Sequence, residues 1–207
     1  MGERRPLRSA RAIFLDRDGV LSRNILNPHS GVLEAPLTPD GFQLMPGAIE
    51  ALAKLADGGF QLILVSNQPN YAKGKASLAT LAAIHRKFEA ALADASIQFT
   101  EFNYCLHHPE GVVPGYSGVC SCRKPSPYFL LRAEERYRLD RRGCWMIGDR
   151  LTDVECGRAA GVTTILIAPP NEPERAYRGP APHHTAADLA EAVGIVMLKA
   201  NARNSSS

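Results

Sequence analysis

Short, continuous apolar runs alternate with longer amphipathic stretches over most of the chain. Runs of this kind, without polar alternation, are typical of strands buried on both faces of a parallel sheet. We expect five such strands, at residues 12–16, 61–65, 102–106, 144–147 and 163–168. Between them, apolar residues recur at helical spacing and predict helices near 46–58, 77–95, 127–137, 152–160 and 186–198. This alternation predicts an α/β fold with a doubly wound parallel sheet.

These strands and helices predict a single domain over residues 12–199. A chain of 207 residues buries about 70 % of its unfolded surface, which is enough for one hydrophobic core. Residues 1–11 hold four arginines without an apolar face, so we expect a flexible tail there. The serine-rich residues 200–207 are expected to be disordered, and residues 19–45 to form one long loop.

The charge pattern limits the classes of partner. The net charge of +3 is small, and acidic and basic residues are interleaved, as in the stretch 132–142. This distribution is typical of a solvated surface and argues against nucleic-acid binding. No apolar run has the length of a signal-peptide core or a membrane span, so we expect a cytoplasmic protein without membrane contact. Five cysteines in such a chain favour reduced thiols and metal binding over disulfides. We also expect a monomer.

Polar side chains follow several of the expected strands at the point where each strand ends. Asp16 and Asp18 follow the first strand, Ser66 follows the second and Asp149 follows the fourth. Lys124 precedes a helix that begins on the same side of such a fold. Since ligands of open parallel sheets bind beyond the carboxyl ends of the strands, this convergence favours an active site.

Four segments at these positions resemble the motifs of the haloacid dehalogenase-like (HAD-like) phosphatase superfamily. They are DRDG at 16–19, VSNQ at 65–68, Arg123-Lys124-Pro125 and IGDRLTD at 147–153. The resemblance covers residues 12–168, and it implies a HAD-like fold and magnesium-dependent hydrolysis of a phosphate ester through an aspartyl-phosphate intermediate.

The resemblance also implies the role of each site residue. Asp16 is the expected nucleophile, and Asp18 is the expected acid and base toward the leaving group and the attacking water. Ser66 is expected to bind phosphoryl oxygens, while Lys124 supplies fixed positive charge. A catalytic Mg²⁺ would be held by Asp16, Asp149 and the backbone carbonyl of Asp18.

Asp153 lies four residues after Asp149, and its type and position allow two interpretations. It can position Lys124 or a metal-bound water. Alternatively, it is an acid in the first turn of a helix, where the helix dipole favours negative charge. Both interpretations remain open from the sequence.

A second signature consists of four soft metal ligands in two close pairs, separated by twelve residues that are rich in glycine and proline. The set matches a closed tetrahedral site and predicts a structural zinc ion bound by Cys105, His107, Cys120 and Cys122. The segment is similar to the zinc loop of the heptose-bisphosphate phosphatases, which the histidinol-phosphate phosphatases share. His108 is an alternative to His107, and Cys144 and Cys156 are expected to be small buried hydrophobes.

The chain leaves no room for a large cap domain, so a few polar contacts must select the substrate. The residues expected to make them are Asn67, Gln68, Arg123 and Arg150. The resemblance implies a sugar bisphosphate, D-glycero-D-manno-heptose 1,7-bisphosphate, which would be hydrolysed to a heptose monophosphate. Two alternatives stay open, namely a phosphatase of histidinol phosphate or another small phosphomonoester, and a zinc-stabilised binding protein without catalysis.

Overall fold

The computed structural model describes residues 10–27, 31–168 and 179–204. None of the helices in these ranges is long and apolar enough to cross a membrane. In chain order the elements are β1 (Arg11–Leu15), β2 (Ile25–Leu26), β3 (Leu33–Glu34), α1 (Ala48–Asp57), β4 (Phe60–Asn67), α2 (Leu78–Asp94), β5 (Glu101–Cys105), α3 (Tyr128–Tyr137), the 3-10 helix η1 (Arg141–Gly143), β6 (Trp145–Gly148), α4 (Leu151–Ala160), β7 (Thr163–Ile167), β8 (His184–Ala186) and α5 (Leu189–Asn204).

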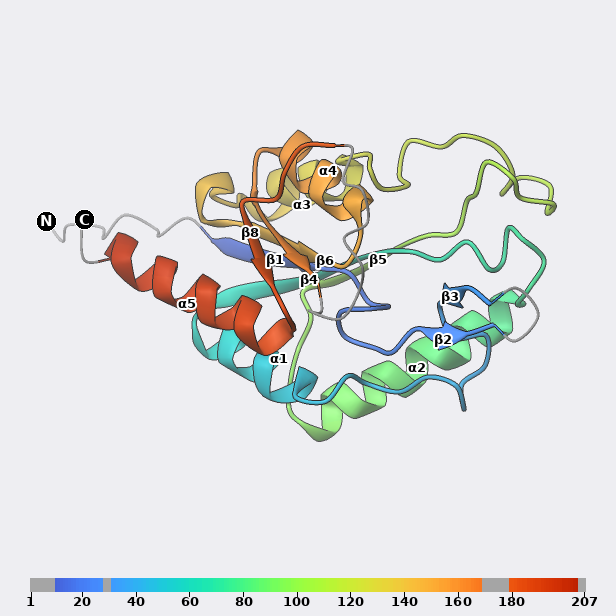
Figure 1. Ribbon diagram of the computed structural model, residues 1–207, viewed down its shortest axis with the longest axis horizontal. Coiled ribbons are helices and arrows are strands. Elements are labelled where there is room, and N and C mark those ends of the chain that lie inside the picture. Colours follow the sequence, from blue (N-terminus) through green and yellow to red (C-terminus); the bar gives the residue numbers. More distant parts are fainter. Residues whose placement is uncertain (1–9, 28–30, 169–178, 205–207) are drawn as a thin grey trace, which may run out of the picture.

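A six-stranded sheet in the order β5-β4-β1-β6-β7-β8 forms the centre of the molecule (Figure 1). Every neighbouring pair is parallel. The chain begins in the middle at β1, builds one side through β4 and β5, and then crosses to the other side through β6, β7 and β8. The expected α/β fold with a doubly wound parallel sheet is therefore confirmed.

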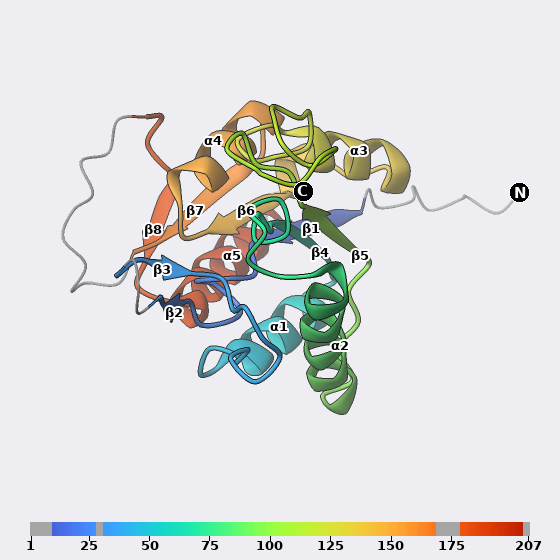
Figure 2. The ribbon, with the colours of Figure 1, turned by 90° about the vertical axis from the view of Figure 1, so that its right-hand side faces the viewer.

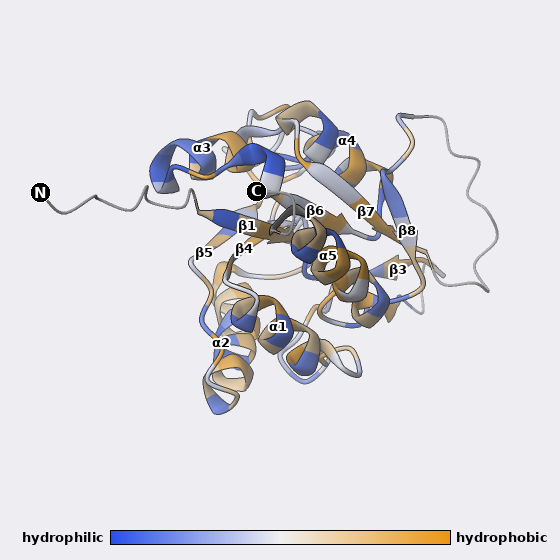
Figure 3. Cartoon of the chain, turned by 90° about the vertical axis from the view of Figure 1, so that its left-hand side faces the viewer, coloured by the Kyte–Doolittle hydropathy of each residue, from blue (hydrophilic) through white to orange (hydrophobic). Residues whose placement is uncertain are grey.

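Helices cover both faces of the sheet, with α1, α2 and α5 on one face and α3 and α4 on the other (Figure 1). Successive residues of β1 alternate between the two cores, because side chains of a strand point to opposite faces. Ile13 and Leu15 pack in the core with α1, α2 and α5, while Ala12 and Phe14 pack in the core with α3 and α4. Hydrophobic residues accordingly mark the central strand β6 and the second half of β7 in Figure 3. This burial on both sides explains why the strands have continuous apolar sequences.

Four short elements of the structure were not expected from the sequence. The expected loop 19–45 contains the short antiparallel pair β2–β3, and η1 precedes β6. A sixth strand of the main sheet, β8, pairs with β7 at the sheet edge. Each of these elements is only two or three residues long, which is too short to give a periodic pattern.

The ends of the domain also differ from the expected boundaries. Arg11 belongs to β1 and Ala10 forms an isolated bridge with Leu139, so these two residues of the expected tail 1–11 are ordered parts of the fold. Helix α5 begins at Leu189 and continues to Asn204, into the segment 200–207 that was expected to be disordered. Residues 1–9 and 205–207 lie outside the described part of the chain.

Candidate active site

Three neighbouring strands, β4, β1 and β6, bring the predicted site residues together at their carboxyl ends, which face the viewer in Figure 2. Asp16 directly follows β1, Ser66 is the second-last residue of β4, and Asp149 directly follows β6. The amide of Asp16 still donates to the carbonyl of Ile147 at 3.0 Å, so the nucleophile candidate is held by the sheet itself. The predicted convergence of these residues is present in the structure.

Two glycines of the motifs allow carboxylates to approach the backbone closely. Gly19 has a φ of +91°, and a Cβ atom there would lie 2.1 Å from Oδ2 of Asp149. A Cβ atom on Gly148 would lie 2.2 Å from the Cβ of Asp153. Any larger residue at either position would displace a carboxylate, so both glycines are steric requirements of the site.

Lys124 supplies a buried cation between two carboxylates. Its Nζ lies 3.0 Å from Oδ1 of Asp16 and 2.6 Å from Oδ1 of Asp153, and it donates to the carbonyl of Val65 at 2.8 Å. Burial alone would lower the pKa of Lys124, but the charges of Asp153 and Asp16 outweigh burial and raise it. The lysine is therefore charged wherever the protein is folded near neutral pH.

Asp153 fulfils both interpretations that the sequence left open. Its Oδ1 contacts Lys124, while its Oδ2 accepts a hydrogen bond of 3.0 Å from the amide of Arg150 and so completes a capping box at the start of α4. Burial raises the pKa of Asp153 to about 6, and the charge of Lys124 opposes this rise. The residue thus positions Lys124 and begins a helix at the same time.

Asp16, Asp149 and Asp153 form a cluster that could hold a metal ion, with carboxylate oxygens within 4.8 Å of one another. Burial and the charges of Asp16 and Asp153 raise the pKa of Asp149 to about 8. The Oδ1 atom of Asp149 is buried and has no hydrogen-bond partner among the described residues. A hard divalent cation would relieve the repulsion between the carboxylates and would give Oδ1 of Asp149 a close partner, so these donors fit Mg²⁺.

The carboxylate of Asp18, two residues after Asp16 in the chain, is fully engaged by protein donors. Oδ1 accepts from Arg17 Nε at 3.1 Å and from Ser22 Oγ at 2.9 Å. Oδ2 accepts from Arg17 Nη2 at 3.1 Å and from Gln68 Nε2 at 2.5 Å. Arg17 was not among the predicted site residues, because an arginine between two aspartates resembles an ordinary surface charge in the sequence.

The two amide residues of VSNQ contact protein groups. Asn67 donates from Nδ2 to the carbonyl of Lys124 and accepts at Oδ1 from the amide of Lys124, both at 3.1 Å. Gln68 donates from Nε2 to Ser66 Oγ at 3.0 Å as well as to Asp18. These contacts occupy the polar atoms of Asn67 and the Nε2 atom of Gln68.

Arg150 lies near enough to Arg123 for its charge to act on that side chain. Burial lowers the pKa of Arg123; the charge of Arg150 adds to this effect, whereas neighbouring cysteines oppose it. Arg123 donates to the carbonyl of His107 at 3.3 Å, and Arg150 Nε lies 3.9 Å from Oδ1 of Asp149. The side chain of Arg150 is half exposed. The pair therefore adds positive charge beside the carboxylate cluster.

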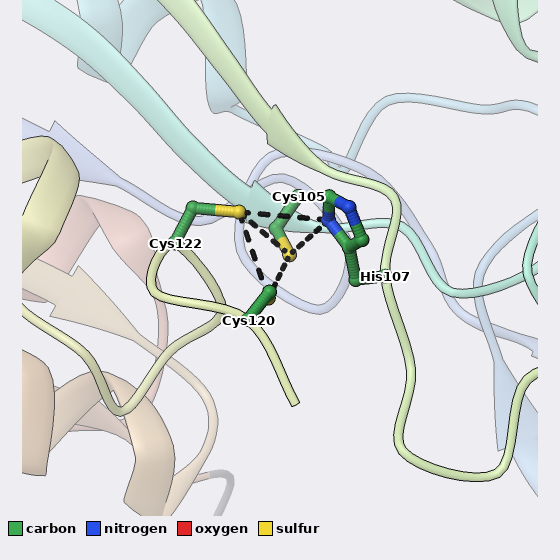
Figure 4. A group of neighbouring side chains, drawn as sticks. All are labelled: Cys105, His107, Cys120 and Cys122. Carbon is green, nitrogen blue, oxygen red and sulfur yellow. Dashed lines mark hydrogen bonds between the residues drawn. The ribbon is translucent and has the colours of Figure 1, made fainter. Parts of the chain in front are cut away.

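Cys105, His107, Cys120 and Cys122 converge in a second cluster, shown in Figure 4. The sulfur atoms lie 3.3–3.7 Å from one another, and Nδ1 of His107 lies 3.7 and 3.9 Å from the sulfurs of Cys122 and Cys105. Metal–ligand bonds of about 2.0–2.3 Å in tetrahedral geometry require ligand separations of about 3.3–3.8 Å. The four side chains therefore lie close to the spacing of a tetrahedral metal site.

The loop that links the two ligand pairs packs on the segment after β4. The ring of Tyr116 stacks on His107 at 5.4 Å and meets Tyr71 edge-on at 4.7 Å. The amide of Val112 donates to the carbonyl of Ala72 at 2.7 Å. These contacts hold the loop beside the carboxyl ends of the strands (Figure 2).

Comparison with known proteins identifies relatives that match most of the chain. The HAD-hydrolase-like family model matches residues 121–192. D-glycero-beta-D-manno-heptose-1,7-bisphosphate 7-phosphatase of Escherichia coli (strain K12) is 36% identical over 166 residues, 80% of this chain and 83% of that protein. D-glycero-D-manno-heptose-1,7-bisphosphate 7-phosphatase of Chlorobaculum tepidum is 33% identical over 206 residues, 96% of this chain and 100% of that protein.

Solved structures give the same result. D,D-heptose 1,7-bisphosphate phosphatase from B. bronchiseptica, complexed with magnesium and phosphate, has a TM-score of 0.75 and 29% identity, covering 92% of this chain and 99% of that chain. A putative HAD-like phosphatase from Mesorhizobium loti has a TM-score of 0.76 and 25% identity, covering 98% and 91%. On sequence and fold together, this chain belongs to the D-glycero-D-manno-heptose-1,7-bisphosphate 7-phosphatase family of HAD-like phosphatases.

Proposed function

We propose that this chain hydrolyses the 7-phosphate of D-glycero-D-manno-heptose 1,7-bisphosphate through a covalent phosphate on Asp16. The observation that carries the proposal is the contact of the Asp16 carboxylate with buried Lys124, next to Asp149 and two residues from Asp18. Membership in the heptose-bisphosphate phosphatase family supports the substrate.

The reaction proceeds in two steps, each of which uses Asp18. In the first step a carboxylate oxygen of Asp16 bonds to phosphorus while the bond to the sugar oxygen breaks, and Asp18 gives its proton to that oxygen. In the second step water attacks phosphorus, its proton passes to Asp18, and the Asp16 carboxylate and inorganic phosphate are released. Lys124 offsets the negative charge that would otherwise repel the nucleophile from the phosphoryl oxygens.

Asp16, Asp149 and the backbone carbonyl of Asp18 are the proposed magnesium ligands. When bound, the ion would supply further positive charge to the phosphoryl oxygens. The Oδ1 atom of Asp149, which has no hydrogen-bond partner among the described residues, and the raised pKa of Asp149 support this assignment. Asp153, the third member of the carboxylate cluster, already contacts Lys124 and Arg150, so we assign it a positioning role.

We assign a structural zinc ion to Cys105, His107, Cys120 and Cys122, because four protein ligands leave no open position for water. The described loop 108–119 contributes almost nothing to either hydrophobic core, so the metal would add to the contacts of Tyr116 and Val112 that hold it. His108 is not in the cluster, and its Nδ1 accepts from the amide of Glu110 at 3.1 Å instead. These contacts favour His107 as the ligand.

Protein purified without added metal is expected to contain about one zinc ion per chain, since four ligands form a closed site. Cys120→Ser should lower that zinc content and the activity together, because loss of the metal would loosen the segment that leads directly into Arg123. Elemental analysis and turnover measure the two effects. Cys144→Ser is the matched control, as this buried thiol lies outside the cluster. Zinc-free protein with full activity would show that the four side chains have no metal-dependent role.

Arg123 and Arg150 are the proposed contacts to the second anionic group of the substrate. Both are cationic and stand beside the cluster that would bind the first phosphate. Asn67 and Gln68 were expected to contact the substrate directly. Because Asn67 is paired with Lys124 and Gln68 with Asp18, we propose that the two amides contribute by positioning these residues.

The heptose bisphosphate is expected to be hydrolysed at the 7-position with a higher kcat/KM than its monophosphate product. Arg123→Ala should reduce this preference by about tenfold to a hundredfold, the value of one lost charge-assisted contact. Turnover on both compounds and on histidinol phosphate measures the preference, and Arg86→Ala on the exposed face of α2 is the control. Preference for histidinol phosphate would assign the chain to that alternative branch.

We further propose that the enzyme acts in the cytoplasm as a monomer, on a small sugar phosphate and without nucleic acid or membrane. The carboxylate cluster and Lys124 meet within one chain, so the proposed site does not require a residue from a second subunit. The five cysteines are free thiols, and three of them form the soft-metal cluster. Reduced thiols of this kind support a reducing compartment.

A further inference from the structure

Arg17, between the proposed nucleophile and the proposed acid, is a buried side chain with a direct contact to one of them. It is 1% exposed. Its guanidinium faces the Asp18 carboxylate edge to edge, with Nε on Oδ1 and Nη2 on Oδ2, each at 3.1 Å. Such a two-bond pairing fixes the plane and the orientation of a carboxylate, which a single ammonium group cannot do.

Aromatic rings line the rest of the guanidinium. Its central carbon lies 5.8 Å from the ring centre of Phe42 and 5.6 Å from that of Tyr104. Among the described residues, Asp18 is the carboxylate that forms an ion pair with Arg17. Burying a charged group costs free energy unless an opposite charge is paired with it. The Arg17 guanidinium therefore stays on Asp18, its carboxylate partner.

The donors around Asp18 differ in how easily they can be displaced. A carboxylate has about four acceptor positions, and Arg17, Ser22 and Gln68 occupy all four. A leaving-group oxygen can therefore approach Asp18 only where one donor gives way. Gln68 is that donor, because its Nε2 keeps a second partner, Ser66 Oγ, at 3.0 Å.

We propose that Arg17 is a positioning residue that keeps Oδ2 of Asp18 directed toward the phosphoryl site, where the leaving-group oxygen replaces the Gln68 amide. The proposal rests on the acid and base role of Asp18 given above. In the first step the proton on Oδ2 passes to the sugar oxygen as the ester bond breaks, while Arg17 holds the carboxyl group in place. The Arg17 side chain contacts the Asp18 carboxylate alone among the reacting groups and is not proposed to touch the phosphorus or the sugar oxygen.

Two Arg17 variants and two leaving groups test the role of this side chain. Arg17→Met keeps the aliphatic volume without the two N–H donors. Arg17→Lys keeps the positive charge without the paired N–H groups of a guanidinium. Arg17→Met should lower kcat on the heptose bisphosphate by about a hundredfold, at the low end of general acid contributions. The kcat on 4-nitrophenyl phosphate should fall less, because that leaving group needs no acid and only the attack of water then depends on Asp18. KM should stay unchanged, and Arg17→Lys should lie between Arg17→Met and wild type.

Phe42→Leu is the control for packing, since it loosens one wall around Arg17 and leaves the ion pair intact. It should affect both substrates equally. If Arg17→Met does not fold, the ratio of the two kcat values in Arg17→Lys decides the question. A ratio equal to that of wild type in the folded Arg17 variants would overturn the positioning role. Wild-type protein without activity on either substrate would contradict the proposed function instead.

Discussion

Asp16→Asn is expected to lower turnover of the heptose bisphosphate by about 10⁴-fold or more, the scale on which enzymes lose activity with their nucleophile. The amide cannot form the covalent phosphate, and its NH₂ group would face Lys124 if it replaced the oxygen 3.0 Å from Nζ. Steady-state turnover measures the loss. Mass spectrometry of quenched reactions should find phosphate on Asp16 in wild type and none in the variant.

Asp57→Asn, at the exposed end of α1, is the matched control and should keep wild-type activity. The melting temperature of Asp16→Asn should remain within a few degrees of wild type, because the substitution removes one negative charge from a crowded carboxylate cluster. Wild-type turnover by the variant, with no deamidation to aspartate, is the result that would refute the assignment of Asp16.

Lys124→Met is expected to lower both turnover and stability. Turnover should fall by about 10²- to 10³-fold, because one preorganised positive group is lost from the phosphoryl site. The free energy of unfolding should fall by about 3–5 kcal/mol at pH 7.5, because Asp16 and Asp153 remain buried without their cation. Urea unfolding measures the second effect, with Lys54→Met on the exposed face of α1 as the control.

The deficit of Lys124→Met should shrink as the pH falls. Without the lysine, the pKa of Asp153 rises further above the value of about 6 in wild type, since Lys124 is the charge that opposes the effect of burial. The folded variant then binds a proton that the unfolded chain releases, and its stability increases toward pH 5. An unfolding free energy that is independent of pH and equal to that of wild type would contradict the buried ion pair.

The sheet and the location of the site could be predicted because they depend on local sequence. Strands that are buried on both faces need continuous apolar runs, and such runs form β1, β4 and β6. Once those strands are parallel, Asp16, Ser66 and Asp149 must meet at one edge. The four-ligand cluster could be predicted for a similar reason, because its two ligand pairs lie at the two ends of a single loop.

Arg17 and the partners of Asn67 could not be predicted, because both depend on contacts between distant segments. The burial of Arg17 requires Phe42 and Tyr104, which lie far along the chain. Asn67 meets Lys124 across a separation of 57 residues. Strand β8 was missed because three residues at a sheet edge are recognisable only beside β7.

Two hydrogen bonds join the side chain of Asn67 to the backbone of Lys124. They fix the position of Lys124 independently of the loop that precedes it in the chain. The lysine is fastened to the end of β4, while the twelve residues between His107 and Cys120 are enclosed by the ligand cluster. Mutations in those twelve residues can therefore change the loop beside the site without moving Lys124. A fold built in this way can acquire new substrates over evolutionary time, and a designer can exchange the same loop as a module.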